Sequence, residues 1–237
     1  MTVALAAVRV SVLGCLLAVI GLAWSMLVAM TGHEMMSPAT WTAAHAASIL
    51  AMWVLMMVAM MLPSALPMIL ILDRFQRKGV VTALFSTGYM IVWIGFSIAA
   101  TLSQWALDRM GLLSASMAVT STRIAAAVFI AAGVYQFTPS KRACLDACRS
   151  PVAFLAARWQ DGRSGALRMG LTHGVYCLGC CWLLMALLFV GGVMKLLWIV
   201  PVALFVLIEK FAPTGAHIRI AGGVLFTGWG VVALIWS

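Results

Sequence analysis

Five residues with metal-binding side chains lie close together in an apolar stretch of the chain, between Leu171 and Phe189. Steps of three and four residues keep side chains on one face of a helix. If the stretch is helical, His173, Cys177, Cys181 and Met185 form a stripe about 18 Å long, with Cys180 beside it. Imidazole nitrogen, thiolate and thioether are the ligands that soft metal ions prefer. The pattern therefore indicates a soft-metal site inside an apolar helix.

A second stripe of sulfur follows from the methionines, of which the chain has 17. Met52, Met56 and Met60 repeat every four residues in another apolar stretch, so they would share one helical face. A methionine stripe on its own is usually packing material. If the two stretches cross a membrane in opposite directions, however, Met60 and the adjacent cysteines Cys180 and Cys181 come to similar depths near the middle of the membrane. We therefore expect the two stripes to face one another.

Two connections between the apolar stretches hold further candidate ligands. His33, Met35 and Met36 form an outer cluster that could collect a metal, although the same loop also has the composition of a helix start at an interface. Cys144 and Cys148, four residues apart, would face together on one helical turn and could share a metal on the inner side. They could instead be unrelated interfacial cysteines in a basic segment that contacts lipid.

Composition places the chain among membrane proteins. Hydrophobic residues make up 65% of its 237 residues, and charged residues only 9%. The mean hydropathy is +1.10. These values favour a polytopic membrane protein, with residues 1–237 forming a single integral membrane domain. The net charge of +9 does not indicate a nucleic-acid partner, because the basic residues lie in short connections, where they set topology.

The apolar runs predict an all-α polytopic membrane helix bundle with about seven transmembrane helices. Twelve of the 15 basic residues would then lie on one side, leaving Arg109, Arg123 and Lys195 on the other. By the positive-inside rule that side is the cytoplasm, so the N-terminus is expected inside. The predicted helices lie near 10–31, 46–72, 80–106, 118–138, 166–193, 196–211 and 217–236.

The two sulfur-bearing helices also share the pattern W-x-L-M, at Trp53 to Met56 and at Trp182 to Met185. They would run in opposite directions through the membrane. Helices 1–3 and 4–6 could therefore form an inverted repeat, an arrangement that lets some transporters expose one site to either side in turn.

Several motifs carry a family resemblance. Residues 45–212 contain M-W-x-L-M-x-x-A-M-M-x-P from Met52, Y-Q-x-T-P from Tyr135 and C-L-x-x-C-R-x-P from Cys144. They also contain C-x-G-C-C-W-x-L-M from Cys177 and the dipeptide Glu209-Lys210. With these motifs the chain resembles an uncharacterised bacterial family of predicted metal-binding integral membrane proteins. The resemblance implies metal binding, but neither a particular metal nor a reaction.

Ligand chemistry favours copper as the metal. Zinc takes cysteine and histidine but has little use for thioethers, whereas Cu(I) accepts cysteine, histidine and methionine in two- or three-coordinate sites. A monovalent ion also has a smaller desolvation cost in lipid than a divalent one. Zinc or iron, and the absence of any metal, are the alternatives.

The sequence thus predicts a copper-handling protein of the bacterial inner membrane that transports or delivers Cu(I), and not an enzyme. The ion would pass along the outer cluster, the methionine stripe, the central cysteines and the inner cysteine pair. Expected partners are the lipid bilayer and a copper chaperone, an oxidase or other membrane-complex subunits. No G-x-x-x-x-G-K-[ST] motif is present, so no nucleotide is expected.

Two other functions fit the same residues. Cys177 and Cys180 have the spacing of a dithiol/disulfide couple that Cys181 could resolve, which would suit a membrane thiol redox protein. The methionine stripe has no task in that scheme. Alternatively, the cysteines and methionines mainly pack, and the protein is a non-catalytic subunit or assembly factor of a membrane complex.

Overall fold

A computed structural model describes residues 2–31, 41–76, 79–114, 117–193 and 195–236, and within these ranges the protein is built from helices. The all-α class predicted from the sequence is confirmed. The helices are α1 (Thr2–Thr31), α2 (Ala43–Gln76), α3 (Gly79–Arg109), α4 (Thr122–Tyr135), α5 (Pro139–Arg149), α6 (Pro151–Arg158), α7 (Gly162–Gly191), α8 (Leu196–Phe211) and α9 (Gly215–Ile235).

Five of these helices, α1, α2, α3, α7 and α9, are long and apolar enough to cross a membrane. Helices α4 and α8 have 14 and 16 residues. At 1.5 Å per residue they extend about 21 and 24 Å, less than the roughly 30 Å of a bilayer's hydrocarbon core. The five long helices account for five of the seven predicted spans, while the other two spans and the orientation remain predictions.

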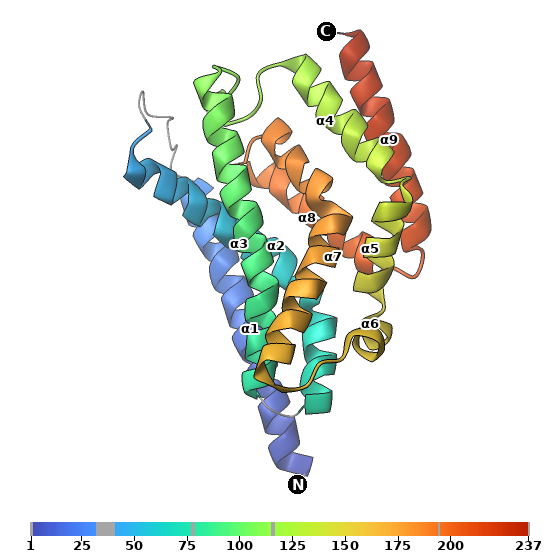
Figure 1. Cartoon of the computed structure of the whole chain (residues 1–237). Coiled ribbons are helices and arrows are strands. Elements are labelled where there is room, and N and C mark those ends of the chain that lie inside the picture. Colours follow the sequence, from blue (N-terminus) through green and yellow to red (C-terminus); the bar gives the residue numbers. More distant parts are fainter. Residues whose placement is uncertain (1, 32–40, 77–78, 115–116, 194, 237) are drawn as a thin grey trace.

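Helix α7 lies inside the bundle, with α3 along one side of it and α5 and α4 along the other (Figure 1). Helix α2 packs against α3, α1 packs against α2, and α9 packs along α4. Glycines permit the close approach of α3 and α7: a Cβ atom at Gly170 would collide with the backbone oxygen of Phe85, and one at Gly88 with that of Leu167. Because these glycines have no side chain, the backbones of α3 and α7 come into contact, and this contact fixes the position of α7.

The inner connection predicted between 138 and 166 contains two short helices, α5 and α6. Each begins with proline at its first turn, Pro139 and Pro151, where the missing N–H needs no partner. The Thr138 hydroxyl caps α5 by accepting a hydrogen bond from the backbone N–H of Lys141, at 3.2 Å. Because α5 packs against α7, it brings residues of this connection to the middle of the bundle.

Candidate metal centre

Sulfur atoms from three helices meet in the interior of the bundle. Cys177, Cys180 and Cys181 of α7 are each only 1% exposed. The side chain of Cys148, from α5, hydrogen-bonds with those of Cys177 and Cys180. From α2, the thioether sulfur of Met61 lies 3.9 Å from the thiol sulfur of Cys181. The centre therefore contains four thiols and one thioether.

Two of the thiols are turned back toward their own helix. The Sγ atoms of Cys180 and Cys181 each donate a hydrogen bond to the backbone oxygen of Cys177, at 3.0 Å. Within the described ranges, no group of three or more histidine, cysteine or acidic side chains is arranged to hold a metal ion. A metal could thus be coordinated by several of these thiols only if side chains such as Cys180 and Cys181 rotate away from that carbonyl.

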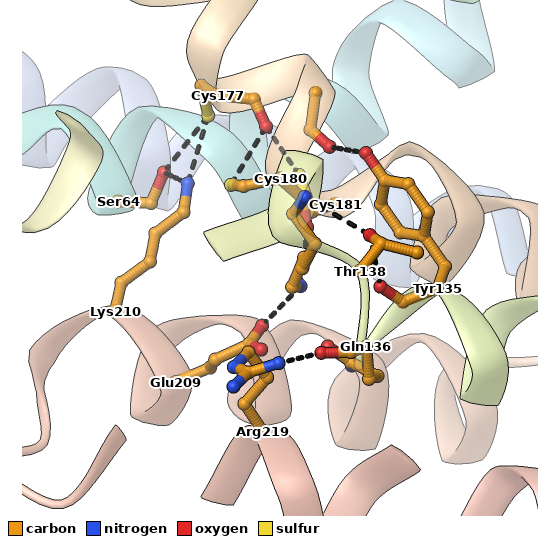
Figure 2. Close-up of polar contacts among 12 residues, drawn as sticks. Ser64, Tyr135, Gln136, Thr138, Cys177, Cys180, Cys181, Glu209, Lys210 and Arg219 are labelled. Carbon is orange, nitrogen blue, oxygen red and sulfur yellow. Dashed lines mark hydrogen bonds and ion pairs between the residues drawn. The ribbon is translucent and has the colours of Figure 1, made fainter. Parts of the chain in front are cut away.

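A lysine ammonium group lies directly against the sulfur centre. The Nζ atom of Lys210, at the end of α8, donates to Cys177 Sγ at 2.9 Å and to Ser64 Oγ at 3.0 Å (Figure 2). Lys210 is only 5% exposed. A buried ammonium is strongly destabilised without a countercharge. Cys177 supplies that countercharge when it is a thiolate.

Tyr89 of α3 completes the surroundings of Cys177. Its hydroxyl lies 3.0 Å from Cys177 Sγ and donates to the backbone oxygen of Met61 at 2.9 Å. The Ser64 hydroxyl donates to the same oxygen at 2.8 Å. Cys177 is thus held in a polar environment built by α2, α3 and α8.

A buried ion pair lies beside the centre. Lys141 Nζ of α5 is 2.8 Å from Glu209 Oε2 of α8, and the two side chains are 0% and 1% exposed. The Lys141 ammonium also donates to the backbone oxygen of Cys180. Beyond Glu209, the guanidinium of Arg219 donates to the backbone oxygen of Gln136 (Figure 2). This polar cluster ties α5, α8 and α9 to the cysteine-bearing part of α7.

His173 lies on the turn of α7 before Cys177 and is 2% exposed. Its ring packs among Phe85, Tyr89 and Phe154, with ring centroids 5.2 to 5.8 Å away. The Nδ1 atom is buried and has no hydrogen-bond partner among the described residues. Such a nitrogen is available to a ligand that the structure does not contain.

The predicted methionine ligands within the described residues are buried, but a different methionine of α2 makes the contact with a cysteine sulfur. Met52, Met56 and Met60 are 2%, 0% and 1% exposed, and Met185 is 0% exposed. The side chain of α2 that reaches the cysteines is Met61, which follows Met60 and is not a member of the predicted stripe. Helices α2 and α7 therefore do meet through sulfur, one residue away from the expected position.

The two inner cysteines have different neighbours. Cys148 bonds with the α7 thiols, and these hydrogen bonds raise the pKa of its own thiol well above the usual value. Cys144, one turn earlier, lies against Gly179, where an added Cβ atom would be 2.7 Å from Cys144 Sγ. Burial raises the pKa of the Cys144 thiol. The outer candidates His33, Met35 and Met36 lie outside the described residues.

Sequence reasoning missed the charged residues at the centre. It gave Glu209 and Lys210 only as a motif and did not predict that they are buried, at 1% and 5% exposed. It also gave no role to Tyr89 and did not connect Lys141 with α8. The dipeptide Glu209-Lys210 was the available signal, since adjacent opposite charges at the end of a very apolar helix are candidates for buried pairing.

Fold and site together define a helical protein of membrane type with a buried centre rich in sulfur. The PpoB2 family, described as copper chaperones, matches residues 50–233, which is most of the chain, and the protein belongs to that family. This membership supports a copper-related function, in agreement with the metal expected from the ligand types. Comparisons with curated proteins and with solved structures gave no match.

Proposed function

We propose that the protein is a membrane copper chaperone that binds Cu(I) at the sulfur centre and hands it to a partner. The observation that carries the proposal is the convergence of Cys148, the three α7 cysteines and Met61 from three separate helices. Thiolates and thioethers together suit Cu(I) better than zinc. Membership of a copper-chaperone family supports the same metal.

The geometry suits a transferable ion better than a permanent one. Cys180 and Cys181 are held by weak hydrogen bonds to a carbonyl, so rotation about their Cα–Cβ bonds can bring the thiols to an ion. Cu(I) is stable with two or three ligands. Ligands can then be exchanged one at a time, and the partner's ligand can bind before the last protein ligand leaves.

Further ligands extend the proposed route beyond the centre. We assign His173, with its unpartnered Nδ1 atom, and the buried thioether of Met185 to neighbouring positions on α7. Met52, Met56 and Met60 line α2 toward its other end, His33, Met35 and Met36 are proposed to collect copper outside, and Cys144 is proposed to serve the inner side. In this scheme the protein moves an ion without catalysing a reaction.

We place the protein in the bacterial inner membrane with seven spans and the N-terminus inside. The distribution of basic residues over the connections supports this orientation. The large apolar side chains exposed on α9, among them Leu225 and Trp229, are 63% and 62% exposed and suit contact with lipid. The partners would be a copper donor and an acceptor such as an oxidase subunit.

Copper content and X-ray absorption of the purified protein test this function. The wild type, loaded with Cu(I) under reducing conditions, should show sulfur neighbours at about 2.3 Å. Simultaneous replacement of Cys177, Cys180 and Cys181 by serine should abolish this signal. Cys15→Ser, which changes an exposed cysteine of α1, is the matched control and should bind copper normally. Equal copper binding by the triple variant would refute the proposal.

Thiol redox chemistry is the second candidate, and one contact favours it. Cys148 bonds with Cys177 and Cys180 from a different helix, so a disulfide could link α5 to α7. In that case the purified protein would exchange two electrons reversibly at a defined potential, and Cys148→Ser would abolish the exchange. If the protein binds Cu(I) tightly and shows no reversible dithiol/disulfide couple, the result supports the copper chaperone and excludes the redox function.

A further inference from the structure

The sulfur centre carries a fixed positive charge that ordinary metal ligands do not explain. Lys210 Nζ bonds to Cys177 Sγ at 2.9 Å and to Ser64 Oγ at 3.0 Å, and all three side chains are buried. The serine hydroxyl is neutral, so the charge of the ammonium is balanced only through sulfur. Among the described residues, the carboxylate nearest in sequence, Glu209, pairs with Lys141 and not with Lys210.

We propose that Lys210 makes this centre selective for a monovalent soft cation over a divalent one. The inference rests on the proposed function, because it assigns a role to Lys210 at the copper site. It names Lys210 as a specificity-determining residue that balances charge, not as a ligand.

Charge counting gives the reason. Cu(I) held by two thiolates leaves one negative charge, which the Lys210 ammonium neutralises. A divalent ion such as Zn(II) on the same two thiolates is already neutral, and the ammonium would then leave one uncompensated positive charge in the interior. Uncompensated charge is strongly unfavourable in a region of low dielectric constant. The same protein ligands therefore bind the monovalent ion with better charge balance.

The neighbouring charges do not reverse this count. Lys141 and Glu209 form an ion pair of zero net charge beside the centre. Arg219, 5% exposed, adds a positive charge beyond Glu209, which disfavours a divalent ion further. Figure 2 shows Lys210 reaching Cys177 from the side of Ser64, whereas Glu209 and Arg219 lie on another side of the cluster. Lys210 is thus the cation in direct contact with the sulfur.

The test compares affinities for Cu(I) and Zn(II) in Lys210→Met, which keeps a long side chain but removes its charge. Each affinity is measured by competition with a chromophoric chelator, in detergent and under anaerobic reducing conditions. The ratio of Cu(I) to Zn(II) affinity should fall by at least about tenfold relative to the wild type. Lys210→Arg, which keeps the charge, should retain more of the wild-type ratio than the methionine variant.

Lys195→Met is the matched control, because Lys195 is an exposed lysine at the other end of α8. It should leave both affinities unchanged. An unchanged ratio in Lys210→Met, or an equal loss of both affinities, would overturn the inference. Wild-type protein that binds neither metal would refute the proposed function instead, so the two failures are distinguishable.

A second measurement on the wild type decides the matter if Lys210→Met does not fold. Ag(I) and Cd(II) are both soft ions that favour thiolates, and they differ in charge. The wild type should prefer Ag(I) over Cd(II) more strongly than does a peptide with the sequence of residues 177–181, which carries the same three thiols without Lys210. An equal or weaker preference in the protein would overturn the role of Lys210.

Discussion

The thioether sulfur of Met61 lies 3.9 Å from the thiol sulfur of Cys181, across the boundary between α2 and α7. The two helices touch here through side chains, and α3 packs against both of them. Because of this contact, Met61 is the methionine of α2 that we propose as a ligand beside the cysteines.

Met61→Leu should weaken Cu(I) binding about tenfold while leaving the fold intact. Leucine has nearly the volume of methionine, and such replacements usually cost less than about 1.5 kcal/mol. Chelator competition measures the affinity, and thermal unfolding in detergent measures the stability. Met68→Leu is the control, since Met68 is an equally buried methionine of α2, 1% exposed. A similar loss of affinity in both variants would show that packing, and not the thioether, is responsible.

Cys148→Ser should lower the copper affinity more than Cys144→Ser does. Both residues lie on α5, one turn apart, but Cys148 bonds with Cys177 and Cys180 whereas Cys144 lies against Gly179. The sulfur coordination number from X-ray absorption should fall in Cys148→Ser and remain unchanged in Cys144→Ser. The reverse order would assign the inner thiol ligand to Cys144.

Glu209→Gln should destabilise the protein by about 3–5 kcal/mol, because it leaves the ammonium of Lys141 buried without its counter-ion. Combining it with Lys141→Met removes both charges and should recover much of that loss. Unfolding of the two single variants and the double variant forms a double-mutant cycle. Additive losses in the double variant would show that the two charges do not stabilise one another.

His173→Phe should separate metal binding from stability. Its ring packs among Phe85, Tyr89 and Phe154, and its buried Nδ1 atom has no partner within the described structure. Phenylalanine removes this unsatisfied atom, so the melting temperature should stay the same or rise. Copper affinity should fall if the nitrogen is a ligand, as we propose. A large drop in melting temperature with unchanged copper affinity would contradict this role.

The helical class and the meeting of two sulfur-bearing helices could be predicted from the sequence, because hydropathy and helical spacing are local properties. The exact contact could not, since the rotation of α2 about its axis decides whether Met60 or Met61 faces α7. That rotation depends on how α2 packs against α3. The position of α7 depends in turn on Gly88 of α3 and Gly170 of α7, which permit the close approach of those two helices.

The charged part of the centre was harder to predict. Lys141 and Glu209 are 68 residues apart, and neither has a local signal that names its partner. A charged residue near the end of an apolar helix is usually placed at the membrane interface, because burial is unfavourable without pairing. Only the path of α5 along α7 reveals that the pairing exists.

The hydrogen bond between Lys210 and Ser64 joins residues 146 positions apart. During synthesis the ribosome produces α2 and all the cysteines before α8, so the thiols of a nascent chain lack their ammonium neighbour. The finished environment of Cys177 exists only after nearly the whole chain has been made and α8 has docked. If the protein binds Cu(I) as proposed, an ion that arrives earlier would meet thiols without this electrostatic partner, so we expect loading to follow translation.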